Sequence, residues 1–287
     1  MKFSISTWLS QHAPAPVAAF FARKDVQAVI EWVKEPVYAV LLMFGLTTII
    51  AQPFYVPSGS MEPTLAIGDA VLAAKFPYGY SRYSMPFDHI FLGRAKETPK
   101  QVMARLPQVG DVVVFRLPRD TTVTYVKRVI GLPGDRVQMK EGHLWINGKQ
   151  LPLKPAGMGE NEDEWGGFSE VPRFIETLPN GKEHVIFKER WDGIADNTGV
   201  YVVPPDHIFM MGDNRDHSLD SRFSVDGRVL GTDYVASSEG GVGYVPAGNL
   251  VGRAFIVIGS VDFKNADGNI LEWPLQFRFS RVLNRVR

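Results

Sequence analysis

The chain has 287 residues, enough for one large or two modest domains with a real core. Hydrophobic residues make up 45% and charged residues 22%, a composition typical of globular proteins rather than disordered ones. The 31 basic and 31 acidic residues cancel, so nothing in the charge indicates a nucleic-acid partner. The absence of cysteine excludes a thiol nucleophile, a thiolate metal site and a disulfide.

An uncharged run from Pro36 to Met61 is the first marked feature along the chain. Its part from Pro36 to Phe54 predicts a membrane-spanning helix, about 28 Å long at a rise of 1.5 Å per residue. Pro36 suits the first turn of such a helix. The alternatives are a buried core helix and a cleaved signal peptide. The run is apolar on every side, which argues against the first, and no clean small-x-small site follows it, which argues against the second.

Basic residues lie on one side of this run: Arg23, Lys24 and Lys34 precede it, and none follows before Lys75. Positively charged flanks stay in the cytoplasm. We therefore expect residues 1–35 to be cytoplasmic, residues 36–54 to be a single membrane anchor, and the rest to face outward. A second apolar segment, residues 13–22, is too short to span and would lie at the membrane interface or begin a helix.

Short apolar or alternating runs recur after residue 55 and predict a mainly β fold. The strands expected from these runs are residues 69–76, 111–117, 122–130, 207–211 and 253–261. Residues 136–200 are richer in charged and turn residues, and we expect them to form an inserted β subdomain between two parts of a core, 55–135 and 201–287. The pairs Asn147-Gly148 and Asn180-Gly181 predict tight hairpins within the insertion. Residues 155–168 are expected to form an exposed loop.

Residues 57–65, PSGSMEPTL, place Ser58 and Ser60 around one glycine. A serine hydroxyl is a poor nucleophile until a base accepts its proton. None of the six histidines lies in a triad signature, and the G-x-S-x-G pattern is absent at Ser60. His217, in a polar loop, is better interpreted as a surface residue. A base of another residue type is therefore needed.

A lysine can serve as that base if burial lowers its pKa, because an ordinary lysine is only about 0.1% neutral near pH 7.4. In TVTYVKRVI, strand alternation places Lys127 on one face with Val123, Tyr125 and Val129. The neighbours of Lys127 on this strand face are therefore apolar, unlike those of most lysines of the chain. The competing interpretation is a lysine that extends to solvent from an edge strand.

A third motif, GDNRDHSLDSR, occupies residues 212–222 directly after the predicted strand 207–211. The carboxylates of Asp213, Asp216 and Asp220 would suit a metal, but two arginines neutralise them and the spacing is not that of an EF-hand loop. An ion-paired loop that orients a catalytic group through Ser218 is the favoured interpretation. We assign no metal site.

Three motifs thus stand in order: PSGSMEPTL at 57–65, YVKRVIGLPGD at 125–135 and GDNRDHSLDSR at 212–222. With the preceding apolar run, they closely resemble bacterial type I signal peptidases, from about residue 36 to the end. The resemblance implies that Ser60 is the nucleophile and Lys127 the general base. It also implies that Ser58 and the Ser60 amide form the oxyanion hole and that Ser218 positions Lys127. Asp220 and Arg222 would be a supporting ion pair.

The same resemblance implies a membrane-bound peptidase that cleaves exported preproteins after small-x-small sites, typically Ala-x-Ala. Its implied fold is a β-rich catalytic core with an inserted β subdomain, preceded by one N-terminal transmembrane helix. No cofactor is implied. The implied partners are signal peptides, the lipid bilayer and the export machinery, in the bacterial inner membrane with the catalytic domain on the periplasmic side. The residues implied to line the substrate pockets are Phe54, Val56, Pro57, Met61, Leu65, Tyr125 and Val126.

The chain departs from the family pattern where residues 224–242 separate the third motif from the stretch Gly243-Tyr244-Val245-Pro246. At its end, the stretch WPLQFRFSRVLNRVR carries four arginines, which suit either a solvated face or tail or contact with anionic lipid.

Two other classes of function stay open at this point. The first is an autoprotease, for which Ala247-Gly248 is a conceivable target. The second is a tethered binding module, which gives no reason for a buried Lys127. The distance between Ser60 Oγ and Lys127 Nζ separates an enzyme from the binding module.

Overall fold

The computed structural model describes residues 14–85, 88, 90, 99–162, 167–233, 235, 240–262 and 276–287. Expectations that fall on residues 1–13, 163–166, 234, 236–239 and 263–275 lie outside these described residues. The chain divides into two compact units, Met1–Thr47 and Thr48–Arg287, and each is treated by itself.

The first unit contains α2 (Ala15–Ala22) and most of α3 (Lys24–Ile49). A proline lies in the first positions of α2, so the interpretation of this segment as a helix start is confirmed. Pro36 lies inside α3 instead of in its first turn, because the helix-forming residues before it extend the helix back to Lys24. None of the residues of α3 is buried, so the alternative of a core helix is wrong.

The predicted helix 36–54 is also wrong at its second end. Residues Ala51–Tyr55 form strand β1, which pairs antiparallel with β2 (Asp69–Ala74) and sets Phe54 opposite Val71. The backbone groups of this apolar stretch are thus satisfied by a sheet rather than by a helix. Among the residues described, no helix is both long enough and apolar enough to cross a bilayer.

The second unit is built on a seven-stranded sheet of described residues, in the order β1-β2-β14-β3-β4-β12-β13. All neighbouring strands in it run antiparallel. Its remaining strands are β3 (Val112–Leu117), β4 (Asp120–Gly131), β12 (His207–Met211), β13 (Val245–Pro246) and β14 (Leu250–Ser260). The five strands predicted from apolar runs are confirmed, each within three residues of its expected bounds. Continuous apolar stretches or alternation of apolar residues made these strands predictable from the sequence.

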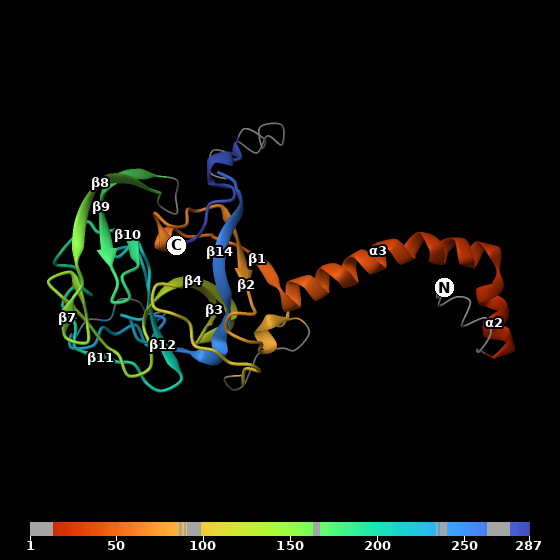
Figure 1. Ribbon diagram of the computed structural model, residues 1–287, viewed down its shortest axis with the longest axis horizontal. Helices are drawn as coiled ribbons and strands as arrows, with labels where there is room; N and C mark the ends of the chain where they lie inside the picture. Colours follow the sequence, from red (N-terminus) through yellow and green to blue (C-terminus); the bar gives the residue numbers. More distant parts are fainter. Residues whose placement is uncertain are drawn as a thin grey trace. The chain divides into compact units, whose positions relative to one another are not determined.

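Between β4 and β12 the chain forms two small sheets, ordered β10-β9-β8 and β11-β5-β6-β7. Figure 1 shows the labelled strands of these sheets on one side of β14 and β3. Their bounds are β5 (Arg136–Lys140), β6 (His143–Ile146), β7 (Lys149–Gln150), β8 (Leu153–Glu162), β9 (Phe168–Thr177), β10 (Glu183–Phe187) and β11 (Tyr201–Val202). Both Asn-Gly pairs lie in hairpin connections. Asn147 and Gly148 both have positive φ, 52° and 78°, as a type I′ turn requires.

The expectation of an exposed loop over residues 155–168 is wrong for its described part. Residues Leu153–Glu162 are strand β8, which pairs with β9 and is an edge strand. An edge position tolerates Pro155 and Gly157, and the register shifts between Pro155 and Met158 to accommodate them. Composition alone suggested a loop because an edge strand needs few apolar residues.

The C-terminal segment differs from one of the two interpretations of its arginines, the solvated face or tail. It contains the short 3₁₀ helix η5 (Phe279–Arg281), and Arg281 pairs with the buried Asp69 at 2.7 Å. Arg278 donates to Ser260 Oγ at 2.8 Å, and Val286 is buried in the core beneath β2 and β14. The solvated tail is therefore wrong for this segment. Lipid contact stays a prediction for Arg285 and Arg287, which are exposed.

Candidate active site

The loop that carries the two serines begins where β1 ends. Val56 donates its N–H to Asp69 O, and residues Gly59–Met61 form the 3₁₀ helix η1. Met61 and Leu65 are completely buried in the core cluster under this loop. They anchor the loop from below and do not line the groove, so their prediction as pocket residues is wrong. These two side chains are apolar because they pack in the core. A sequence motif cannot tell an apolar residue that packs in the core from one that contacts substrate.

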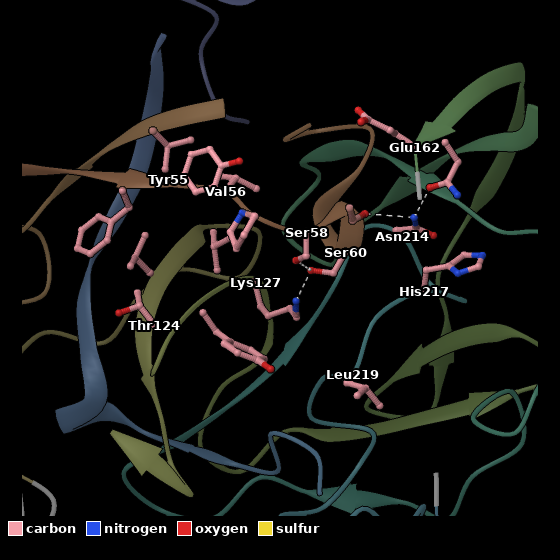
Figure 2. A pocket seen from close by; sticks show the side chains of 18 residues that line it. Tyr55, Val56, Ser58, Ser60, Thr124, Lys127, Glu162, Asn214, His217 and Leu219 are labelled. Atoms are coloured by element: carbon pink, nitrogen blue, oxygen red, sulfur yellow. Dashed lines mark hydrogen bonds between the residues drawn. The ribbon is translucent and has the colours of Figure 1, made fainter. Parts of the chain in front are cut away.

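Lys127 reaches Ser60 from β4, which lies between β3 and β12 in the interior of the sheet. Its Nζ lies 2.5 Å from Ser60 Oγ, a hydrogen bond across 67 positions of sequence. Only 3% of Lys127 is exposed, so the alternative of a lysine extending to solvent from an edge strand is wrong. Figure 2 shows the two side chains meeting next to Ser58.

Burial lowers the pKa of Lys127 from its ordinary 10.5 to about 8. The negative charges of Asp220 and Asp213 act in the opposite direction, while the positive charge of Arg222 lowers the pKa further. At a pKa of about 8, roughly a fifth of the molecules carry a neutral Lys127 near pH 7.4. The fold thus supplies a usable base without a histidine.

Ser58 lies beside Ser60 and Lys127. Its Oγ is 3.4 Å from Ser60 Oγ, and its backbone is extended just before η1. Asn214 holds the loop from the other side, since its N–H donates to Ser60 O at 3.2 Å and its Nδ2 donates to Gly59 O at 3.1 Å. The third motif therefore fixes the backbone that presents both hydroxyls.

Gly212 passes between the two motifs with no room for a side chain. A Cβ there would lie 2.4 Å from Ser60 O and 2.3 Å from Ser218 Oγ, closer than any real contact. Ser218 is buried, and within the described part of the chain its Oγ has no hydrogen-bond partner, Lys127 included. The role of Ser218 in positioning Lys127 stays a prediction.

The interpretation of residues 212–222 as an ion-paired loop is confirmed. Asp220 bonds Arg222 through both oxygens, at 2.8 and 2.9 Å, and both are buried. Asp213 likewise meets Arg128 at 2.6 and 2.7 Å. Asp220 is thus matched by a cation of the loop itself and Asp213 by a cation of β4, whereas Arg215 of the loop pairs with Glu176 of β9.

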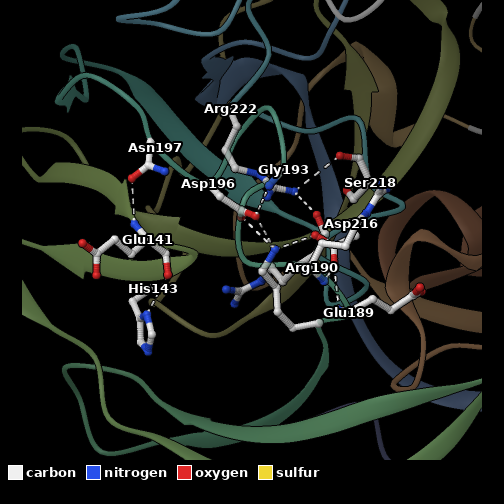
Figure 3. A network of polar contacts seen from close by, with 12 residues as sticks. Glu141, His143, Glu189, Arg190, Gly193, Asp196, Asn197, Asp216, Ser218 and Arg222 are labelled. Carbon is white, nitrogen blue, oxygen red and sulfur yellow. Dashed lines mark hydrogen bonds and ion pairs between the residues drawn. The ribbon is translucent and has the colours of Figure 1, made fainter.

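Asp216, the remaining carboxylate of the loop, belongs to a buried network that includes residues just after β10. Lys188 Nζ lies 2.5 Å from Asp216 and 2.7 Å from Asp196. The N–H groups of Glu189 and Arg190 also donate to Asp216 (Figure 3). This network ties the third motif to residues 188–197.

A groove of about 570 Å³ opens over Ser60 and Lys127. Five of the residues expected to contact substrate line it, namely Phe54, Val56, Pro57, Tyr125 and Val126. The groove also takes in residues that the sequence did not single out for it, among them Thr124, Asn161, Glu162, Asn214, His217 and Leu219. Asn161 and Glu162 belong to β8, and no local pattern connects them with a serine about a hundred positions earlier.

A buried carboxyl bonds the backbone of one groove residue. Glu62 is 4% exposed, and its Oε2 accepts the N–H of Glu162 at 3.0 Å. Burial, with a smaller contribution from the neighbouring Glu162 carboxylate, raises the pKa of Glu62 to about 7, although the bond from the Glu162 N–H acts in the opposite direction. This contact fastens the end of β8 to the serine loop.

Comparison with known proteins shows the family of the chain. A sequence model of the family described as "Signal peptidase, peptidase S26" matches residues 29–259, most of the chain. The chain belongs to this family. The matched range includes all three motifs and both members of the Ser60–Lys127 pair.

Other signal peptidases resemble the chain over most of its length. The signal peptidase I of Rickettsia typhi is 36% identical over 269 residues, covering 87% of this chain and 90% of that protein. The enzyme of Rickettsia akari is 33% identical over 261 residues, covering 87% of each. A crystal structure of a signal peptidase I from Enterococcus faecalis V583 is 23% identical, with a TM-score of 0.27, and covers 52% of this chain and 97% of that one.

Proposed function

We propose that this member of the signal peptidase family is a membrane-bound serine endopeptidase that removes N-terminal signal peptides from exported preproteins. The observation that carries the proposal is the 2.5 Å contact between Ser60 Oγ and Lys127 Nζ, with Lys127 buried. Burial lowers the pKa of Lys127 to about 8, which supplies the neutral amine that a serine nucleophile requires.

In the first half of the reaction, neutral Lys127 accepts the hydroxyl proton of Ser60 as Oγ attacks the carbonyl carbon of the scissile peptide. The carbonyl oxygen becomes negatively charged and is stabilised by Ser58 Oγ and the Ser60 N–H, each worth about 3 kcal/mol in comparable sites. The C–N bond then breaks, and Lys127 gives its proton to the departing amine. The signal peptide stays as an ester on Ser60.

In the second half, a water molecule takes the place of the departed amine. Lys127 accepts a proton from this water, which attacks the ester carbonyl. The Ser60–acyl bond breaks, and the proton returns from Lys127 to Ser60 Oγ. Asp220 and Arg222, paired beside Lys127, and Ser218 are proposed to hold the lysine in place during both halves.

Small-x-small specificity is proposed to come from the apolar half of the groove, formed by Phe54, Val56, Val126 and their neighbours. These side chains narrow the space in front of Ser60 and favour residues the size of alanine. No cofactor is needed for this chemistry.

Membrane attachment is proposed on two observations. The apolar side chains of α3 are exposed, with Val40, Leu42 and Met43 each at least 65% accessible. Basic residues precede them, and none follows before Lys75. Because none of the described helices is both long enough and apolar enough to cross a bilayer, these observations, and not a span, support the proposal.

The proposed location is the bacterial inner membrane, with the N-terminus cytoplasmic and the catalytic core, residues 55–135 and 201–287, on the outer side beside the export machinery. Residues 136–200 would be an inserted β subdomain of that core. Because the chain has no cysteine, single cysteines introduced at Lys24 and Lys149 can report the orientation. An impermeant maleimide added to cells with a permeable outer membrane should label only the second, and labelling of the first would contradict the orientation.

The test of the activity is cleavage of a preprotein in detergent by Ser60→Ala and Lys127→Ala. Each should lose at least about a thousandfold in rate, since a general base alone contributes roughly 10² to 10⁴. The matched controls are Ser169→Ala, on an exposed serine, and Lys75→Met, on a second buried lysine. Full cleavage by either dyad variant would exclude the mechanism.

A further inference from the structure

The groove continues past Ser60 into a part of different chemistry. Its polar half is formed by Asn161, Glu162, Asn214 and His217. Glu162, Asn214 and His217 lie on the opposite side of Ser60 from Tyr55, Val56 and Thr124 (Figure 2). Asn161 is hydrogen-bonded to Asn214. The apolar half accounts for the residues before the cleaved bond. A polypeptide substrate also has residues after that bond, and these must leave across the polar half.

Asn161 and Asn214 form an amide pair in the polar half. Asn214 Nδ2 donates to Asn161 Oδ1 at 2.7 Å and to Gly59 O at 3.1 Å. Because Gly59 O can only accept, these contacts fix which way both amides point. They use both protons of Asn214 and the oxygen of Asn161.

Two polar atoms of the pair are left over: Asn214 Oδ1, an acceptor, and Asn161 Nδ2, a donor. Within the described residues neither has a partner, and neither is among the buried atoms that lack one. Both therefore reach open space, and both residues line the groove. One acceptor and one donor side by side match the N–H and C=O that an extended peptide presents along one edge.

The amide pair is held rigidly. The residue after Asn161 is fastened by the bond from Glu162 N–H to Glu62. Gly59 packs so closely that a Cβ on it would lie 3.0 Å from Glu162 O. Asn214 is 2% exposed and bridges to Phe187 of β10. A pair fixed in advance loses little entropy when it binds a peptide.

We propose that Asn161 and Asn214 are a subsite for the polypeptide on the carboxyl side of the cleaved bond, binding the main chain of the first residues of the mature protein. This inference rests on the proposed function. It assigns β8 a part in substrate binding, because one of the two amides comes from that strand. Recognition through main-chain groups suits an enzyme whose substrates differ in sequence after the cleavage site.

The test compares two substrates with the same residues before the cleaved bond. One ends in an anilide immediately after that bond, and the other continues for four residues. The kcat/KM of the extended substrate divided by that of the anilide measures what the residues after the bond contribute. Comparing this ratio between enzymes cancels the intrinsic difference between an anilide and a peptide.

Asn161→Asp keeps an oxygen for Asn214 Nδ2 but replaces the Nδ2 donor by an acceptor, and Asn161→Leu removes both. We expect each to lower the ratio by about three- to tenfold, the effect of one lost hydrogen bond. The matched control is Glu160→Leu, at the neighbouring exposed position of β8, which should keep the wild-type ratio. A purely structural role would leave Asn161→Asp at the wild-type ratio or lower both substrates in parallel, and either result overturns the subsite.

A second measurement uses only the wild-type enzyme. Substrates N-methylated at the second or third residue after the cleaved bond lack one main-chain donor each. At least one of them should lose the same three- to tenfold in kcat/KM, and full activity on both overturns the inference. If the wild-type enzyme cleaves neither the anilide nor the extended peptide, the proposed function itself fails, which is a different result from an unchanged ratio.

Discussion

Lys127 differs from an ordinary lysine only in where its strand places it. It lies opposite Val113 in the β3–β4 pair, on an interior strand, and its amine meets Ser60 instead of a carboxylate. The nearest acids are already occupied: Asp220 by Arg222 and Asp213 by Arg128. These pairings leave burial as the dominant influence on its pKa.

The first prediction concerns pH. Because burial lowers the pKa of Lys127 to about 8 and only the neutral amine accepts the Ser60 proton, kcat/KM should level off above pH 8. Below pH 8 the protonated form accumulates, and kcat/KM should fall about tenfold per unit. The measurement is a pH profile on a peptide without ionisable groups.

Lys75 provides the control for this profile. It is completely buried, donates to Gln52 and Ser84, and burial lowers its pKa to about 8 as well. Lys75→Met should keep the acid limb where it is in the wild type. If the acid limb moved in this variant, the titration would belong to Lys75, and its assignment to Lys127 would be wrong.

The second prediction concerns Gly212. Gly212→Ala would push its methyl group into Ser60 O and Ser218 Oγ, and the first of these is backbone that cannot rotate away. A shift of the nucleophile by about 1 Å can cost about a hundredfold in rate. We expect kcat/KM to fall by about that factor while circular dichroism stays unchanged. Gly259→Ala, where the nearest atom is 3.9 Å away, should be fully active, and an active Gly212→Ala enzyme would contradict the close approach.

At the scale of elements, the sequence predicts what local patterns encode. The strands of the main sheet have continuous or alternating apolar residues, and the hairpin at Asn147-Gly148 has its turn chemistry, so both could be found. The Ser60 and Lys127 assignments came from motifs, and burial of Lys127 followed only weakly from alternation. Strand β8 could not be found, because an edge strand with Pro155 and Gly157 reads like a loop.

Features that depend on distant pairing also escaped the sequence. Whether residues 51–55 continue a helix or form β1 is decided by β2, which offers them a partner. The same holds for Asn161, which enters the groove only because β8 folds back against the serine loop. The residues next to either segment in the sequence give no indication of these partners, β2 for residues 51–55 and the serine loop for β8.

The third prediction concerns the contact between the serine loop and β8. Burial raises the pKa of Glu62 to about 7, above its ordinary 4.5, so the folded state holds a proton that the unfolded state releases. The stability this provides is present below about pH 4.5 and is lost as pH rises through 7. Glu62→Gln keeps an oxygen for Glu162 N–H without a charge.

Relative to wild type, Glu62→Gln should therefore gain about 1–3 kcal/mol in free energy of unfolding between pH 4.5 and pH 8.5. Urea unfolding at both pH values measures this gain. The control is Glu160→Gln, which changes an exposed carboxylate of β8 and should show no such change in the free energy of unfolding. A difference between Glu62→Gln and wild type that does not vary with pH would refute the assignment.

At the scale of the whole molecule, the candidate active site is assembled from three distant parts of one unit. The serine loop follows β1, the lysine lies on β4, and the third motif follows β12, with all three strands in one sheet. Residues 49 and 50 already belong to this unit, since Ile49 O accepts from Tyr80 and Ile50 O accepts from Lys75. The boundary after Thr47 therefore leaves the sheet intact.

This boundary leads to the fourth prediction, a pair of truncations. A chain that begins at Thr48 keeps β1 and both walls of the groove, so it should cleave a short peptide in detergent with the kcat/KM of the full chain. A chain that begins at Val56 lacks β1, which includes Phe54, and therefore leaves the edge of β2 unpaired. Its kcat/KM should fall by at least about a hundredfold, because the groove wall next to Ser60 is no longer held in place. If the longer fragment folds but does not cleave the peptide, residues before Thr48 contribute to the active site, and the separation of the two units fails.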